Sequence, residues 1–180
     1  MNRTLTRTSS LITYGVVVFF ILSDVFTVLR TRTFDAAVTP LLDPSLTEKG
    51  RLTWEAIAGG PAPYYVAGYA VSVLALLAAA TLLMLVGLDF SRTGGVIRRM
   101  PALVNAAMFA VLGWGVGQFI THIGNNFAAN IHDVQDQWNF MTTINQQTLV
   151  LWLLFLTVLS TIVYVLRHSV DLEQETEDLV

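Results

Sequence analysis

Four apolar runs, each about as long as a membrane-spanning helix, constrain this chain more than any other feature. They are separated by polar connections and cover residues 11–29, 64–88, 102–127 and 148–166. A helix needs roughly 20 mostly apolar residues to cross the hydrocarbon core of a bilayer. The runs therefore predict an all-α integral membrane protein, a four-helix bundle with short loops.

The composition agrees with a single membrane domain. Of the 180 residues, 54% are hydrophobic and 13% are charged, whereas a soluble domain carries about 25% charged residues. Between and after the runs lie two loops, a turn and an acidic tail: 30–63, 128–147, 89–101 and 167–180. We expect the tail to begin as a helical continuation of the fourth run. Basic residues precede the first run as in a signal peptide, but Asp24 and the lack of a small-residue cleavage site favour a retained span.

The distribution of basic residues predicts the orientation, because cytoplasmic connections are enriched in Lys and Arg. The turn 89–101 carries three arginines and the connection 128–147 carries no basic residue. With four spans, both termini share the side of that turn, which holds six arginines: Arg3, Arg7, Arg92, Arg98, Arg99 and Arg167. The other side holds Arg30, Arg32, Lys49 and Arg51. We therefore predict cytoplasmic termini, with the loops 30–63 and 128–147 outside.

The two outer loops differ in composition. The loop 30–63 is interrupted by proline and glycine, and its segment 46–58 mixes apolar and charged residues. This pattern is compatible with a short interfacial helix and equally with an ordered loop over the bundle. The loop 128–147 is rich in amides and acids, and we expect the third and fourth helices to extend into it.

Small residues recur every three or four positions in the third run, which places them on one helical face. They are Ala106, Ala110, Gly113, Gly117, Thr121 and Gly124. The second run has a comparable stripe of Gly68, Ser72, Ala75 and Ala79. Small residues let helices approach closely in lipid, so we expect the two stripes, with Gly113 and Gly117 against Gly68 and Ser72, to meet. A homodimer seam is the alternative.

A polar stripe runs beside the small face of the third run and includes Gln118, His122 and Asn126. Asp24 lies in the same outer half of the first run. Polar groups in hydrocarbon are costly without partners, so these side chains should point into the bundle, where Asp24 and His122 would form a carboxylate–imidazole pair. The cluster is either a proton-sensitive or ligand-binding site that opens outward, or a hydrogen-bonded clamp that fixes helix register.

The sequence offers little for catalysis. His122, His132, Asp133 and Asp136 would supply nitrogen and oxygen ligands to a metal, but their spacing matches no closed metal motif. No nucleophile with a base at supportive spacing and no phosphate-binding loop is present. We therefore expect no enzyme activity, no cofactor and no direct nucleic-acid binding.

A charged surface on the cytoplasmic side is the remaining candidate for a partner. It consists of Arg92, Arg98 and Arg99 in the turn and Glu175, Glu177 and Asp178 in the tail. Together with the outer polar layer, it favours a membrane sensor, regulator or immunity-type protein that contacts a cytoplasmic protein. The alternatives are an accessory subunit of a larger membrane complex, and a binder or carrier of a small hydrophobic or cationic ligand.

Two segments resemble a known family. The turn 89–100, DFSRTGGVIRRM, resembles a connection in four-span bacterial membrane proteins in which a Phe-Ser/Thr pair precedes an Arg-rich helix start. The ending 172–180, LEQETEDLV, is similar to the acidic ending of actinobacterial members, with Asp178 in place of their glycine. The chain thus resembles domain-of-unknown-function family 2975. The resemblance implies a four-helix fold in a bacterial plasma membrane. It also implies a cytoplasmic partner, because some relatives accompany small helix-turn-helix regulators.

Overall fold

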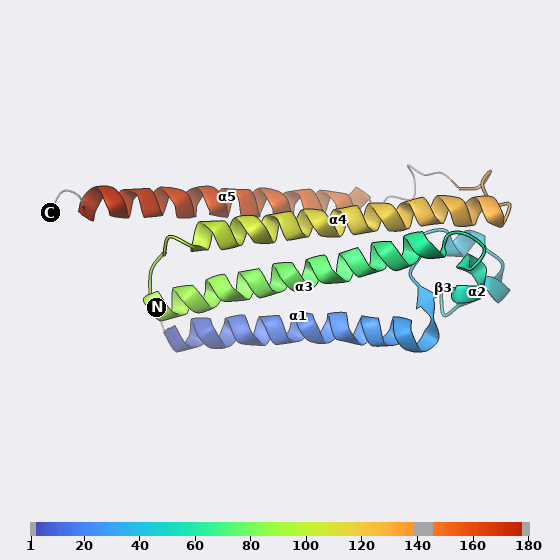
Figure 1. Ribbon diagram of the computed structural model, residues 1–180, viewed down its shortest axis with the longest axis horizontal. Coiled ribbons are helices and arrows are strands. Elements are labelled where there is room, and N and C mark those ends of the chain that lie inside the picture. Colours follow the sequence, from blue (N-terminus) through green and yellow to red (C-terminus); the bar gives the residue numbers. More distant parts are fainter. Residues whose placement is uncertain (1–2, 139–145, 178–180) are drawn as a thin grey trace. The chain divides into compact units, whose positions relative to one another are not determined.

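The computed structural model describes residues 3–138 and 146–177 and confirms an all-α, four-helix fold of membrane type (Figure 1). The four long helices are α1 (Arg3–Thr31), α3 (Ala62–Thr93), α4 (Met100–Ile131) and α5 (Gln146–Glu177). Short elements lie between α1 and α3: β1 (Thr33–Phe34), η1 (Thr39–Leu41), η2 (Pro44–Leu46), β2 (Thr47–Glu48), β3 (Arg51–Thr53) and α2 (Trp54–Ile57).

Each long helix contains a stretch that is long and apolar enough to cross a bilayer. These stretches are Arg7–Thr31, Ala62–Thr93, Met100–Ile131 and Gln147–Leu172, so the chain is a multi-pass membrane protein. The helices α3, α4 and α5 have 32 residues each, or about 48 Å at 1.5 Å per residue. The hydrocarbon core measures only about 30 Å, so these helices continue beyond it.

Local sequence determines where the helices end. Gly94 has a φ of 75°, and its N–H donates to the carbonyl of Phe90 over 2.9 Å, the usual way in which a glycine closes a helix. Pro101 lies in the first turn of α4, where its missing N–H costs no helical hydrogen bond. The connection between α3 and α4 is therefore 94–99, shorter than the predicted 89–101, and Asp89 is helical.

The chain divides into two compact units. We call Met1–Phe19, Ala75–Leu112 and Val150–Val180 the turn unit, because it contains the connection 94–99. We call Phe20–Leu74 and Gly113–Leu149 the cap unit, because it contains the short elements after α1.

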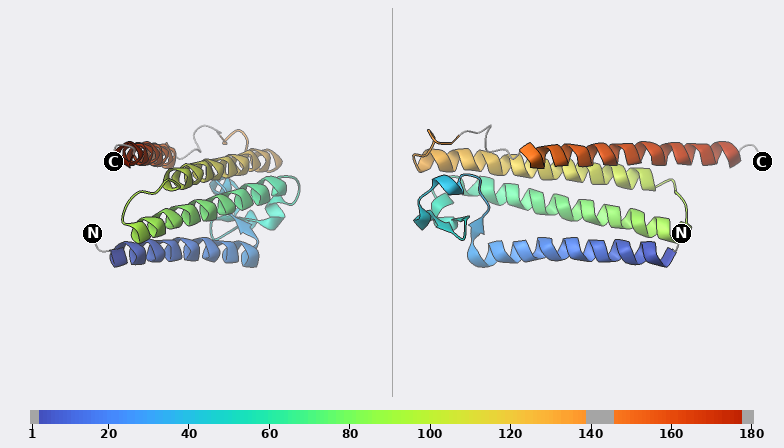
Figure 2. Two further views of the ribbon diagram at one scale, coloured as in Figure 1. Left: turned by 60° about the vertical axis from the view of Figure 1, so that its left-hand side comes forward. Right: turned by 180° about the vertical axis from the view of Figure 1, so that it is seen from behind.

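The turn unit is built from helices alone. Its part of α4 lies between α3 and α5, and α1 lies along the other flank of α3 (Figures 1 and 2). The core joins α3, α4 and α5 through apolar contacts of Ala79, Val104, Val111, Leu159 and Val163. Two further contacts fix neighbouring helices: the Trp152 indole donates to the carbonyl of Val111 over 3.2 Å, and the hydroxyl groups of Tyr14 and Thr81 lie 3.5 Å apart.

The cap unit adds a small antiparallel sheet in the order β1-β3-β2. The turn between β2 and β3 consists of Lys49 and Gly50, whose φ angles of 52° and 77° are those of a two-residue hairpin turn that matches strand twist. The predicted interfacial helix over 46–58 is wrong for most of its length, because this hairpin and the four-residue α2 occupy the segment. The alternative, an ordered loop, describes it better.

The cap unit has its own apolar core. Val38, Leu52 and Ile57 are fully buried, together with Tyr65 of α3 and Ala128 and Ala129 of α4. The ring of Phe34 lies 6.1 Å from that of Tyr65 and 6.2 Å from that of Tyr69. The short elements therefore pack on α3 and α4. The buried side chains that they contribute are far apart in the sequence and come together only when the segment folds.

Candidate functional site

The carboxylate of Asp24 is the centre of a polar cluster in the cap unit. Arg51 of β3 donates to Oδ1 over 3.2 Å, and the hydroxyl of Tyr69 of α3 donates to Oδ2 over 2.9 Å. Nε of Arg51 is buried and lacks a hydrogen-bond partner among the described residues, so Asp24 is the group that balances this guanidinium. One carboxylate thus connects α1, the β2–β3 hairpin and α3.

Two other hydrogen bonds tie the cap unit together. The hydroxyl of Tyr65 donates to Oδ1 of the buried Asn125 over 2.7 Å, which joins α3 to α4. Nε2 of His132 lies 2.9 Å from the carbonyl oxygen of Ala56, which joins the segment after α4 to α2. The segment 32–61 therefore contacts the helices by polar bonds as well as by its apolar core.

The predicted stripe Gln118, His122 and Asn126 lies along α4 in this unit. The amide of Gln118 donates to the hydroxyl of Ser72 over 3.2 Å, and Oδ1 of Asn126 accepts from the indole of Trp138 over 2.6 Å. The imidazole of His122 lies 5.8 Å from a ring of Trp138. The sequence suggested a pair of Asp24 with His122; the structure gives Asp24 the partners Arg51 and Tyr69 and places His122 against Trp138.

The small residues of α3 and α4 meet at backbone contact. A Cβ added to Gly68 would lie 2.7 Å from the carbonyl oxygen of Gly117 and 2.8 Å from the amide nitrogen of Thr121. A Cβ added to Gly117 would lie 2.7 Å from the carbonyl oxygen of Gly68 and 2.8 Å from the amide nitrogen of Ser72. Both positions thus require glycine, and Gly117 faces its own chain and not a second copy.

The sequence offers His122, His132, Asp133 and Asp136 as ligand types for a metal, without the spacing of a metal motif. His132 lies against Ala56, and Asp133 has a φ of 55° just after α4. Among the described side chains, those of 7–138 and 147–172, no group of three or more metal-ligating residues is gathered.

In the turn unit, Asp89 and Arg99 form an ion pair across the connection 94–99. The carboxylate is 4% exposed and the guanidinium 63%. Nε of Arg99 donates to Oδ2 over 2.6 Å, and Nη2 donates to Oδ1. This two-point contact raises the pKa of Arg99 and fixes the start of α4 to the end of α3.

The other members of the predicted partner surface differ from Arg99. Arg92 and Arg98 are exposed. The side chains of Glu175 and Glu177, and the whole of Asp178, lie outside the described residues.

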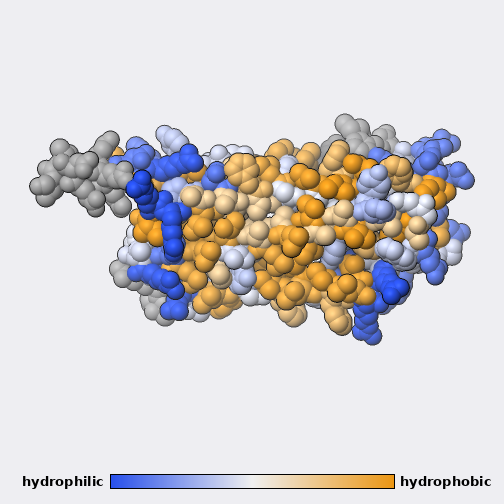
Figure 3. All heavy atoms as spheres, in the orientation of Figure 1, coloured by the Kyte–Doolittle hydropathy of each residue, from blue (hydrophilic) through white to orange (hydrophobic). Residues whose placement is uncertain are grey.

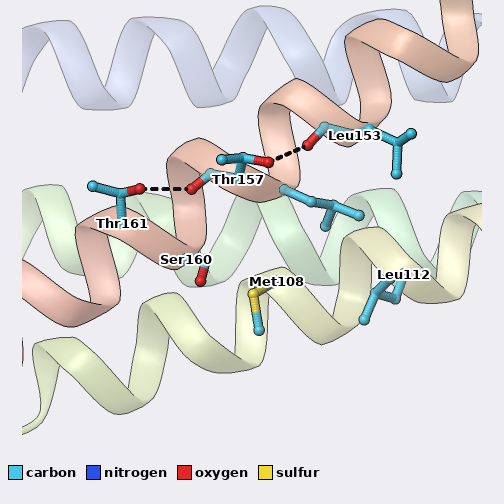
Figure 4. A pocket seen from close by; sticks show the side chains of 7 residues that line it. Met108, Leu112, Leu153, Thr157, Ser160 and Thr161 are labelled. Carbon is cyan, nitrogen blue, oxygen red and sulfur yellow. Dashed lines mark hydrogen bonds between the residues drawn. The ribbon is translucent and has the colours of Figure 1, made fainter.

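A groove between α4 and α5 in the turn unit is lined by Met108, Leu112, Leu153, Leu156, Thr157, Ser160 and Thr161 and has a volume of about 380 Å³. Figure 4 shows Ser160 pointing toward Met108 of α4. The hydroxyls of Thr157 and Thr161 each donate to the carbonyl four residues earlier over 2.9 Å. The groove is thus apolar with a few hydroxyl groups.

Sequence reasoning named Asp24 and missed its partners. Arg51 lies 27 residues away in a loop and was counted only toward orientation. Tyr69 is an aromatic residue of the kind common at a membrane interface. Its position relative to the small residues of α3 did not identify it as a partner of Asp24. One clue to these partners was present in the sequence, namely that an acid in a membrane span needs a hydrogen-bond donor.

The chain matches no protein-family model, and no curated protein and no solved structure is similar to it.

Proposed function

We propose that this chain is a non-enzymatic membrane sensor or regulator, of the kind that includes immunity-type proteins. Its cap unit reads a condition outside a bacterial plasma membrane, and its turn unit contacts a cytoplasmic protein. The observation that carries the proposal is the Asp24 cluster, in which one carboxylate holds the β2–β3 hairpin against α1 and α3. A change in the hairpin therefore acts directly on two membrane-spanning helices.

The cytoplasmic side of the proposal rests on the charged residues. The excess of arginine near the termini and in the connection 94–99 supports cytoplasmic termini. Arg92 and Arg98, together with the acidic tail, supply both signs of charge for a protein partner. The resemblance to domain-of-unknown-function family 2975 would make that partner a small helix-turn-helix regulator.

Site-specific photo-crosslinking in the native host tests the proposal. A photoreactive residue at position 98 should capture one protein of defined mass, and Arg51→Gln should change its yield. Coupling between two sites is typically 1–3 kcal/mol, so the yield should change by about fivefold or more. Lys49→Gln is the matched control, since Lys49 is exposed on the same hairpin and should leave the yield unchanged. No adduct, or equal yields in all three proteins, would refute the proposal.

The groove on α4 and α5 favours a second candidate, an accessory subunit of a larger membrane complex. Hydroxyl groups and small side chains are enriched where membrane helices associate, and Thr157, Ser160 and Thr161 line this groove. Native purification in mild detergent separates the two candidates. A stoichiometric membrane companion lost on Ser160→Leu supports the subunit, and a chain that purifies alone at 19.8 kDa plus detergent excludes it.

A further inference from the structure

Four arginines of the turn unit are exposed near the ends of the apolar runs of its helices. They are Arg7 on α1, Arg92 on α3, Arg98 in the connection 94–99 and Arg167 on α5. Figure 3 shows hydrophilic side chains gathered where these helices end, next to the apolar side chains along their length. Among the side chains that the structure describes, the ion pairs are Asp24–Arg51 and Asp89–Arg99; none of the four arginines belongs to either pair, although the charge of Arg92 also acts on Asp89.

The arginines lie at a consistent depth. Each is at most four residues from an apolar residue that ends its run: Leu11, Leu88, Ala102 and Leu166. Four helical residues span about 6 Å, and the headgroup layer extends about 5–8 Å beyond each side of the hydrocarbon core. The guanidinium groups therefore reach the layer in which lipid phosphates lie.

Two of the described acids lie beside these arginines. The carboxylate of Asp89 is buried against Arg99. Asp171 is exposed on α5 one helical turn beyond Arg167 and on the same face, so it offsets part of the charge of Arg167, whereas Arg98 has no acid in the connection 94–99. Arg92 lies in the last turn of α3, and Arg98 lies six residues farther along the chain, within the connection that the Asp89–Arg99 pair fixes.

The cap unit lacks such a positive layer. Arg51 is paired with Asp24. Lys49, Arg30 and Arg32 are exposed, but so are Asp35, Asp43, Glu48 and Glu55 on the same segment. Basic and acidic groups are therefore mixed on this segment, so its net attraction for an anionic lipid surface is small.

We propose that the turn unit binds the phosphate groups of anionic phospholipids, with Arg92 and Arg98 as the principal contacts and Arg7 and Arg167 beside them. A guanidinium group offers paired N–H donors that match phosphate oxygens, and the two arginines near the fixed connection provide a local site on the lipid-facing rim. This inference is independent of the protein partner proposed above, because it is measured with purified chain and lipid alone.

Native mass spectrometry of the detergent-solubilised full chain tests it, with phosphatidylglycerol and phosphatidylcholine as probes. The wild-type chain should retain phosphatidylglycerol preferentially. The double variant Arg92→Gln/Arg98→Gln should bind it about thirtyfold more weakly, from about 1 kcal/mol for each basic residue near an anionic surface and 1.4 kcal/mol per tenfold. The matched variant Arg30→Gln/Arg32→Gln should change the affinity by much less.

Two further measurements, and two outcomes of the experiment above, decide the proposal. Arg92→Lys/Arg98→Lys keeps the charge but loses the paired N–H donors, so its affinity should lie between those of the wild type and the glutamine variant. A loss equal to that of the glutamine variant would contradict a contribution from charge. Equal losses in the two glutamine variants, or no preference for phosphatidylglycerol in the wild type, would overturn the proposal. Displacement of the lipid by inorganic phosphate at equal concentration would show that the site takes a free anion instead.

Discussion

Among the described residues, the cap unit and the turn unit each contain one aspartate–arginine pair, but the two pairs are buried in opposite senses. In the cap unit the acid, Asp24, is 47% exposed and Arg51 is 21% exposed. In the turn unit the acid, Asp89, is 4% exposed and Arg99 is 63% exposed. The first pair holds a folded segment against helices, and the second closes a short connection between two helices.

This contrast indicates which side chain each unit depends on. A buried carboxylate that loses its only partner keeps the full cost of desolvation, whereas an exposed one is solvated by water. The turn unit should therefore be sensitive to the loss of its arginine. The cap unit should respond moderately to loss of either partner, because Tyr69 also donates to Asp24.

The largest effect is expected from Arg99→Gln. The variant leaves the buried carboxylate of Asp89 without its two-point contact, so the thermal midpoint in detergent should fall more than in any other single variant named here. Adding Asp89→Asn removes the stranded charge and should restore part of the loss. Arg98→Gln, one residue away and exposed, is the control. Equal thermal midpoints for Arg98→Gln and Arg99→Gln would contradict the inference that the turn unit depends on the arginine of its ion pair.

A second test compares helix contacts in the two units through glycine. A Cβ added to Gly117 of the cap unit would lie 2.7 and 2.8 Å from backbone atoms. A Cβ added to Gly87 of the turn unit would meet the side chain of Ser10, whose own Cβ would be 3.0 Å away. Backbone cannot move aside as a serine side chain can. Gly117→Ala should therefore destabilise the fold by about 1–3 kcal/mol, as overpacked cores do, and Gly87→Ala by less.

The control for these substitutions is Gly15→Ala in α1. An added Cβ there meets nothing within 4 Å, so alanine should stabilise the helix by about 0.5–1 kcal/mol relative to glycine. Unfolding in mixed detergent with increasing dodecyl sulfate measures all three variants. A loss of stability in Gly15→Ala, or equal losses at Gly87 and Gly117, would mean that the contacts of an added Cβ do not determine how strongly each substitution changes stability.

The sequence predicted the parts of the fold that depend on apolar length and residue size. The four spans followed from hydropathy alone, because a bilayer sets one length for every crossing helix. The small residues of α3 and α4 could be placed on helical faces because the period of a helix is fixed. These features depend on nearby residues only.

The rest depended on partners far apart in the chain. The strands of the cap have two or three residues each, too few to show an alternating pattern, and the Lys49-Gly50 turn is a weak signal without them. Asp89 marked the end of a span in the sequence, yet α3 continues to Thr93 because Arg99 satisfies the carboxylate. Likewise, the partners of Asp24 became identifiable only once the hairpin placed Arg51 beside α1.

The smallest expected effect concerns the Asp24–Arg51 pair, measured by a double-mutant cycle. Asp24→Asn and Arg51→Gln should each lower the stability of the cap unit slightly, and their combined effect should be smaller than the sum. Because Asp24 is half exposed, the coupling should be about 0.5–1 kcal/mol, as for other solvent-exposed ion pairs. Tyr69→Phe should also reduce stability, and by more when Arg51 is already replaced, because both side chains donate to the same carboxylate. Hydrogen exchange of the amides of β3 reads the cap unit specifically, and strict additivity of Asp24→Asn and Arg51→Gln there would show that the pair does not hold the hairpin against α1. A coupling well above that of an exposed pair would instead mean that the cap excludes water from this contact, and the two ion pairs would then differ less than their exposures indicate.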